Sequence, residues 1–159
     1  MGMYRILIAD DEPIERMVIS KKINNLFQDQ FEIFQAENGR EAVSVHEENM
    51  CDIALLDIEM PVMNGLELAR CLKRIDENIR IIFVTAFEQY ALQAFGVDAV
   101  GYLLKPYLSE DIEKQLKKAF YIKSIPKQEI QIQTMPDLVI RVNGEQLKLG
   151  NTKQEELLA

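Results

Sequence analysis

The chain has 159 residues, of which 48% are hydrophobic, and it carries a net charge of −8. This length allows one domain of ordinary size with a packed core, plus a short appendage. The sequence contains no run of about 18 apolar residues that would cross a membrane, and its N-terminus becomes acidic too early for a secretory signal. Cys51 and Cys71 have neither metal-site spacing nor the density of a disulfide scaffold, so we expect a cytoplasmic location.

The negative charge belongs to the first three quarters of the chain. Residues 1–122 contain 13 Lys and Arg against 21 Asp and Glu, whereas residues 123–159 contain 5 of each. Binding to nucleic acid depends on Lys and Arg that neutralise phosphates. We therefore expect that the acidic segment does not bind DNA or RNA by itself.

Five short apolar runs alternate with five helical patterns. The runs predict strands at residues 4–9, 31–36, 53–56, 81–84 and 99–104. Apolar residues at helical spacing follow each run and predict helices from Pro13 through Phe27 and at about 40–48, 65–74, 88–95 and 109–122. Because most of the strands are apolar almost throughout, they are predicted to be buried on both faces of a parallel sheet.

Polar side chains occur where four of these strands end. Asp10 and Asp11 follow the first strand, Asp57 the third, Thr85 the fourth and Lys105 the fifth. In open parallel sheets, ligands bind beyond the carboxyl ends of the strands. We therefore expect these five side chains to meet at one edge of the sheet.

Three carboxylates at one edge predict a site for a divalent cation. Each carboxylate resists ionisation beside the others, and a hard cation such as Mg²⁺ prefers carboxylate, carbonyl and water oxygens. We assign Asp11 and Asp57 as direct ligands and the main-chain carbonyl of Glu59 as a third. Asp10 is expected to act through a water molecule.

Asp57 is also the predicted nucleophile, because a carboxylate can attack phosphorus to give an aspartyl phosphate. Protein groups then contribute mainly position and positive charge to the transition state. Lys105 is expected to pair with a phosphoryl oxygen, and the Thr85 hydroxyl and the Ala86 N–H to donate to others. Taken singly, each residue has an ordinary explanation as a cap, a loop residue or a surface lysine; their occurrence together favours a site.

Four segments, ILIADDEP, LLDIEMPVMNG, FVTA and YLLKP, resemble the receiver domain of two-component response regulators. The resemblance covers residues 3–122 and implies a flavodoxin-like (βα)5 sheet of strand order 2-1-3-4-5, with a cis peptide bond before Pro106. It implies phosphorylation of Asp57 by a sensor histidine kinase with Mg²⁺. It also implies no enzyme activity beyond the protein's own phosphorylation and dephosphorylation.

The resemblance further implies a switch. Thr85 is expected to move toward the phosphoryl group and Tyr102 to turn inward behind it; the alternative is that Tyr102 is an ordinary half-buried strand aromatic. The affected surface, residues 88–95, 99–104 and 109–122, is the usual dimerisation surface among relatives, so we expect a homodimer promoted by phosphorylation. His46 is expected to be solvated at the end of a surface helix.

Residues 123–128 are predicted to be a linker, and residues 129–159 the truncated start of an output domain, forming a short β-rich extension. Alternation at 129–134, 138–142 and 146–149 predicts three strands, with a turn at Asn143-Gly144 and a helix at 152–159. This pattern resembles the opening of a winged-helix domain of the antibiotic-regulatory type, through whose missing part DNA would be bound. A second candidate arises because YALQAFGVDAVGYLLKP resembles receivers linked to LytTR-type DNA-binding domains. A third is a dimerising or docking arm.

The main functional hypothesis is therefore a phosphorylation switch that controls transcription. A stand-alone receiver that acts through protein contacts is an alternative. A phosphoaspartyl hydrolase of the haloacid-dehalogenase kind is disfavoured, because its Asp-x-Asp motif follows the first strand, whereas Asp57-Ile58-Glu59-Met60 follows the third. A nucleotide-binding protein is disfavoured because no Gly-rich phosphate loop is present.

Overall fold

The computed structural model describes residues 3–28, 30–124, 130–133, 139–142 and 145–148. The chain forms two compact units, residues 1–120 and 121–159, and each is described by itself. None of the helices in the described ranges combines the length and the apolar character needed to cross a membrane.

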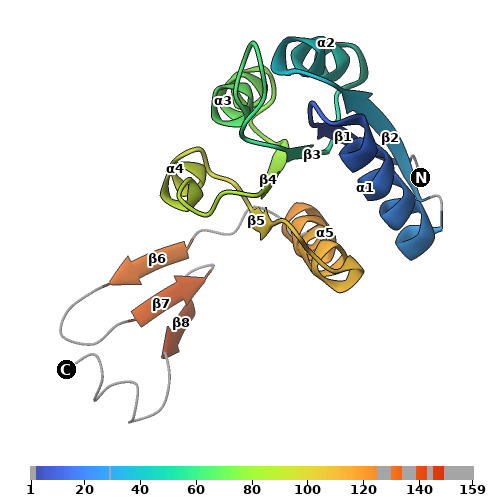
Figure 1. Ribbon diagram of the computed structural model, residues 1–159. Helices are drawn as coiled ribbons and strands as arrows, with labels where there is room; N and C mark the ends of the chain where they lie inside the picture. The colour runs from blue at the N-terminus through green and yellow to red at the C-terminus, as the bar shows by residue number, and fades with distance from the viewer. Residues whose placement is uncertain (1–2, 29, 125–129, 134–138, 143–144, 149–159) are drawn as a thin grey trace. The chain divides into compact units, whose positions relative to one another are not determined.

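The first unit is built on a parallel sheet of five strands in the order β2-β1-β3-β4-β5 (Figure 1). The strands are β1 (Tyr4–Ala9), β2 (Phe31–Ala36), β3 (Ile53–Leu56), β4 (Arg80–Thr85) and β5 (Gly101–Leu104). The helices that connect them or follow them are α1 (Pro13–Phe27), α2 (Gly39–Asn49), α3 (Gly65–Ile75), α4 (Ala91–Gly96) and α5 (Ser109–Ser124). The predicted flavodoxin-like class and strand order are confirmed.

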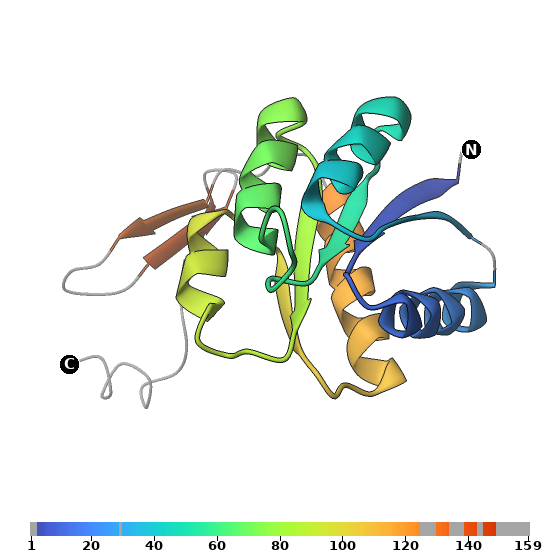
Figure 2. The ribbon, with the colours of Figure 1, turned by 45° about the horizontal axis from the view of Figure 1, so that its top comes forward.

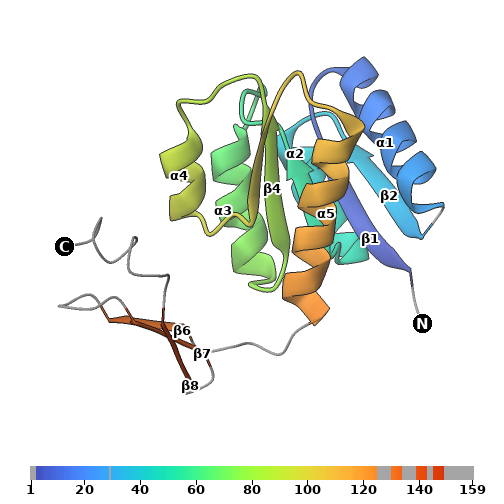
Figure 3. The same ribbon diagram turned by 90° about the horizontal axis from the view of Figure 1, so that it is seen from below.

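Helices cover the sheet on both faces, and the strand residues alternate between the two. Figure 2 shows α2 and α3 on one side of the sheet and α1 and α5 on the other, and Figure 3 shows α5 crossing in front of the strands. In β1, Leu7 joins the core under α2 and α3, and the adjacent Ile6 and Ile8 join the core under α1 and α5. Both faces of the central strands are therefore dry, which explains their unbroken apolar runs.

Two predicted elements begin later than expected. The α4 helix starts at Ala91 instead of residue 88, because residues 88–90 form a turn in which the Ala91 N–H donates to the Glu88 carbonyl at 3.2 Å. The β5 strand starts at Gly101 instead of residue 99. Ala99 is tied to the end of α4, since its N–H donates to the Ala94 carbonyl at 3.2 Å.

The second unit contains three antiparallel strands in the order β6-β7-β8. They are β6 (Ile130–Gln133), β7 (Val139–Val142) and β8 (Glu145–Lys148), close to the three strands predicted there. Residues 123 and 124 of the predicted linker belong to the end of α5. The rest of the linker before residue 130, the Asn143-Gly144 turn and the predicted helix at 152–159 lie outside the described residues.

The prediction for His46 was wrong. Its side chain is fully buried, with 0% exposure, although it lies in the last turn of α2. Its Nδ1 accepts a hydrogen bond from the Cys51 N–H at 3.0 Å, where the chain turns toward β3. Burial lowers the pKa of His46, against the opposing charges of Asp76 and Glu47. The imidazole therefore satisfies a buried backbone donor in its neutral form, a role that helical position alone does not reveal.

We expect His46 to make the fold sensitive to acid. Because its pKa is lower in the folded than in the unfolded chain, the unfolded chain binds more protons below about pH 6.5, and the free energy of unfolding falls as the pH falls. The variant His46→Asn keeps a short acceptor but does not titrate. Denaturant unfolding between about pH 7.5 and 5 should show a weaker pH dependence in the variant, by at most about 1.4 kcal/mol per pH unit. Equal slopes in the two proteins would contradict this role.

Candidate functional site

Backbone hydrogen bonds carry the sheet pairing one residue beyond the strands and set the site's position. Ala9 of β1 is paired with Leu56 of β3. The Asp57 N–H then donates to the Ala9 carbonyl at 2.9 Å, and the Asp10 N–H to the Ala36 carbonyl at 3.2 Å. Asp10 and Asp57, far apart in the sequence, are therefore fixed side by side by the same ladder that holds the sheet.

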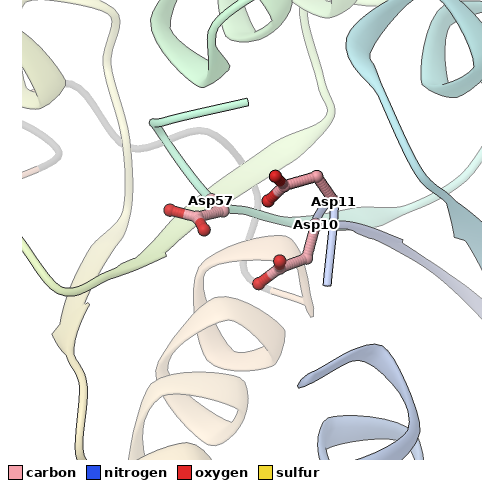
Figure 4. Close-up of side chains that lie close together, drawn as sticks. All are labelled: Asp10, Asp11 and Asp57. Carbon is pink, nitrogen blue, oxygen red and sulfur yellow. The ribbon is translucent and has the colours of Figure 1, made fainter. Parts of the chain in front are cut away.

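Three carboxylates gather at this edge. One oxygen from each of Asp10, Asp11 and Asp57 lies within 4.8 Å of the other two, and Figure 4 shows the side chains together. Asp10 and Asp57 are buried, whereas Asp11 is exposed. Such a set of hard oxygen donors suits Mg²⁺. No other group of three or more possible metal-binding side chains occurs among the residues that the structure describes.

Lys105 joins two of these carboxylates. Its Nζ lies 2.9 Å from Oδ2 of Asp10 and 3.3 Å from Oδ2 of Asp57, with Glu15 further away at 3.9 Å. Burial by itself lowers the pKa of Lys105, but the hydrogen bond to Asp10 and the surrounding negative charges outweigh it and raise the pKa overall. The ammonium group therefore stays charged. A cis peptide bond joins Lys105 and Pro106, as the resemblance implied.

The surroundings of Asp57 disfavour the ionised form of its carboxyl group. Burial raises the pKa of Asp57, and the charge of Asp10 raises it further, while Lys105 acts in the opposite direction. The net effect is a pKa above the ordinary value, so the ionised form is disfavoured. A cation bound beside Asp57 would offset this cost, which is a second reason why the residues present suit a metal ion.

Replacing Asp57 by Asn is expected to stabilise the metal-free protein at neutral pH. A carboxylate with a raised pKa contributes stability below its ordinary pKa and loses it as the pH rises through the folded value. In the presence of a chelator, the unfolding midpoint of Asp57→Asn should rise by a few degrees, the effect of about 1 kcal/mol in a domain of this size. The gain should shrink toward acid pH. The exposed Glu77→Gln is the control; a lower midpoint for Asp57→Asn would contradict the electrostatic argument.

Two further contacts hold Asp10, and sequence reasoning missed them. Its Oδ1 accepts from the Glu12 N–H at 2.9 Å, and its carbonyl accepts from a guanidinium nitrogen of Arg16 at 2.6 Å. The guanidinium also reaches Oε1 of Gln35 at 3.3 Å. Because helical side chains point back toward the N-terminus, an arginine in the first turns of the helix after an Asp-Asp pair was the feature that would have indicated the contact with the Asp10 carbonyl.

The loop between β3 and α3 packs tightly against the backbone of Asp57. Gly65 donates its N–H to the Ile58 carbonyl at 2.7 Å, and a Cβ added at Gly65 would lie 2.1 Å from the Asp57 carbonyl oxygen. Between them, Val62 adopts a φ of 73° in a three-residue turn closed by the Met63 N–H. A positive φ is strained for a β-branched residue. Several contacts therefore fix the conformation of this loop, and only glycine fits at position 65.

Gly65→Ala should disturb both the stability and the position of Asp57. Because the new methyl group would overlap backbone atoms, we expect a loss of about 1–3 kcal/mol in the free energy of unfolding. Reaction at Asp57 should also slow. Gly96→Ala is the matched control, since nothing lies within 4 Å of a Cβ built there. Comparable losses for the two variants in denaturant unfolding would show that close approach is not the reason for Gly65.

Thr85 and Tyr102 are both attached to Phe87. Thr85 is fully buried, and its hydroxyl oxygen accepts from the Phe87 N–H at 3.4 Å. The Tyr102 ring packs on Phe83 at a centroid distance of 6.3 Å, and its hydroxyl donates to the Phe87 carbonyl. The two predicted switch residues therefore contact the same loop residue, one at its main-chain N–H and the other at its main-chain carbonyl. Their switching role stays a prediction.

Glu59 is exposed, and its side chain is turned toward α4. Its Oε1 accepts a hydrogen bond from the Tyr90 hydroxyl at 3.0 Å. The use of its main-chain carbonyl as a metal ligand stays a prediction. No sequence pattern indicates the contact with Tyr90, because the two residues are separated by 31 positions and lie in different loops.

Such a sheet, with a lysine and a carboxylate cluster beyond its strand ends, defines a receiver-type domain. The chain belongs to the response regulator receiver domain family, which it matches over residues 6–117.

Curated relatives are similar over the same part of the chain. The positive alginate biosynthesis regulatory protein of Pseudomonas aeruginosa is 42% identical over 116 residues, which covers 72% of this chain and 46% of the relative. The sensory transduction protein LytT of Bacillus subtilis is 39% identical over 116 residues, covering 73% and 48%. The transcriptional regulatory protein LytR of Staphylococcus aureus is 38% identical over 116 residues, covering 72% and 46%. The chain thus spans about half the length of the curated relatives it matches.

Solved structures share the fold. The response regulator TrrA of Thermotoga maritima, in complex with Mg²⁺ and BeF, has a TM-score of 0.66 at 33% identity and covers 74% of this chain and 99% of its own. The chemotaxis protein CheY4 of Vibrio cholerae has a TM-score of 0.68 at 25% identity, with coverage of 74% and 99%.

Proposed function

We propose that this chain is the phosphoacceptor part of a response regulator, in which Asp57 receives a phosphoryl group from a sensor histidine kinase in the presence of Mg²⁺. The observation that carries the proposal is the position of Asp57. Its carboxylate lies within 4.8 Å of Asp10 and Asp11 and 3.3 Å from the Lys105 ammonium group. Acceptance of a phosphoryl group needs this combination of a nucleophile, hard oxygen ligands and a fixed positive charge.

In the reaction, an oxygen of Asp57 forms the new bond to phosphorus. The bond between phosphorus and the donor's leaving group breaks at the same time, and the leaving group, an imidazole nitrogen in a phosphohistidine, takes the electron pair. Lys105 already contacts Oδ2 of Asp57 at 3.3 Å, so a small movement lets it pair with a transferred oxygen. The Thr85 hydroxyl and the Ala86 N–H supply further donors.

When bound, Mg²⁺ would neutralise negative charge on the carboxylates and on the transferred oxygens. We assign Asp11, Asp57 and the Glu59 carbonyl as its ligands, with Asp10 acting through a water molecule. The complex of TrrA with Mg²⁺ and BeF, a protein 33% identical to this chain, supports the choice of metal.

In this proposal, Thr85 and Tyr102 move after phosphorylation, and their movement changes the surface formed by α4, β5 and α5. On α4, Leu92 is 87% exposed and Phe95 is 85% exposed. Large apolar side chains so exposed favour an interaction surface. This supports the homodimer expected from the sequence, formed through this face and promoted by phosphorylation.

We also propose that the C-terminal region begins a DNA-binding output domain of the LytTR type. The similarity of the receiver domain to LytT and LytR favours this alternative over the winged-helix domain that the tail pattern suggested. DNA would then be bound only through that region. Membership of the receiver family leaves the phosphoaspartyl hydrolase alternative without support, and no enzyme activity is proposed beyond phosphorylation and dephosphorylation of the chain itself.

Incubation with acetyl phosphate and Mg²⁺, followed by intact-mass measurement, tests the proposal. We expect one added phosphoryl group in the wild-type chain, and none in Asp57→Asn or after removal of Mg²⁺. Lys105→Ala should still bind Mg²⁺, because the Lys105 ammonium group pairs with the phosphoryl group and not with the metal. The variant should, however, transmit no signal to the dimer surface. Glu77→Gln should react like the wild type. An unchanged wild-type mass, under conditions in which another receiver reacts, would refute the assignment of Asp57.

A further inference from the structure

A single hydrogen bond connects the two loops that flank Asp57. Glu59 lies in the loop between β3 and α3, two residues after Asp57, and Tyr90 immediately precedes α4. The Tyr90 hydroxyl donates to Oε1 of Glu59 at 3.0 Å. Glu59, the acidic residue nearest to Asp57 in the loop between β3 and α3, is therefore held by a residue of the neighbouring loop.

The Tyr90 ring is anchored, so its hydroxyl is presented at a fixed place. The ring meets Phe87 edge to face at a centroid distance of 6.2 Å and packs against the core cluster that includes Ala94 of α4. The hydrogen bond to Glu59 raises the pKa of Tyr90, so the hydroxyl keeps its proton and acts as the donor. Glu59, in contrast, is exposed and has no comparable packing.

The position of the Glu59 carboxylate matters for any anion that approaches Asp57. Residues two apart have Cα atoms within about 7 Å of each other, which is less than the screening length of about 8 Å at physiological salt. Asp10 and Asp11 already place negative charge beside Asp57, and Lys105 is the cation found in contact with it. A further carboxylate turned inward would add to the repulsion of an anionic phosphodonor.

We propose that Tyr90 is a positioning residue that holds the Glu59 carboxylate against the start of α4, and so limits the negative charge that a phosphodonor meets on its way to Asp57. The inference rests on the proposed phosphorylation of Asp57. It assigns Tyr90 no contact with the reacting atoms: the hydroxyl acts on the rate only through the place where it keeps the Glu59 side chain.

Four proteins test this role: the wild type, Tyr90→Phe, Glu59→Gln and the double variant. Tyr90→Phe keeps the ring and frees the Glu59 charge, whereas in the Glu59→Gln background the freed side chain is neutral. With acetyl phosphate at saturating Mg²⁺, Tyr90→Phe should slow phosphorylation about threefold when Glu59 is present, the effect of bringing a charge a few ångströms nearer in water. In the Glu59→Gln background it should change the rate by less than about 1.5-fold.

Salt dependence separates this role from a purely structural one. The slowing caused by Tyr90→Phe should fade as the ionic strength rises, because the freed charge is screened. A loss of loop structure would persist at high salt and would appear in both backgrounds. Equal slowing in both backgrounds, or slowing that is independent of salt, would overturn the role of Tyr90.

The outcome also distinguishes this inference from the proposed function on which it rests. If the wild-type chain is not phosphorylated, the proposed function fails and this inference fails with it. If all four proteins are phosphorylated at the same rate, Asp57 remains the phosphoacceptor and only the role of Tyr90 is refuted.

Discussion

The structure depends on holding like charges together at the end of a sheet. Asp10 and Asp57 are both buried, and neither can move away, because each continues the backbone hydrogen bonding of its strand. Lys105 offsets part of the repulsion by contacting both carboxylates. The pKa of Asp57 is raised nonetheless, chiefly because its carboxylate is buried, with the charge of Asp10 adding to the effect. The fold thus maintains an arrangement that a bound cation would stabilise, which is the physical basis of the proposed coupling between metal binding and chemistry at Asp57.

Much of this arrangement could be predicted from sequence because its causes are local or topological. The strands follow from apolar runs, and their parallel order brings Asp10, Asp57 and Lys105 to one edge whatever the details of packing. The predicted start of a helix at residue 65 is confirmed, and the close approach of Gly65 to the Asp57 carbonyl shows why a glycine stands there. These features need only the period of the pattern and the direction of the strands.

The features that sequence reasoning missed depend on contacts between side chains and distant backbone. His46 is buried between α2 and β3, where the Cys51 N–H needs an acceptor. Neither residue type predicts this hydrogen bond from the sequence. Arg16 is similar, because its acceptor is a main-chain carbonyl, which every residue possesses. The pairing of Tyr90 with Glu59 joins two loops, and α4 had been expected to start before Tyr90. Periodicity describes which face a residue occupies but not which polar atom it meets.

If Thr85 moves as predicted, Phe87 provides a physical route by which a change at Asp57 would reach the surface of α4. Its N–H is bonded to the Thr85 hydroxyl oxygen, its carbonyl accepts from Tyr102, and its ring contacts Tyr90 just before the helix. A movement of Thr85 toward a phosphoryl group would break the first of these contacts and so loosen Phe87, whose carbonyl is held by the second. Because Tyr90 leads directly into α4, the exposed apolar residues of that helix would shift with it. A switch of this kind would need no long pathway, because a single residue, Phe87, contacts two tyrosines and a threonine.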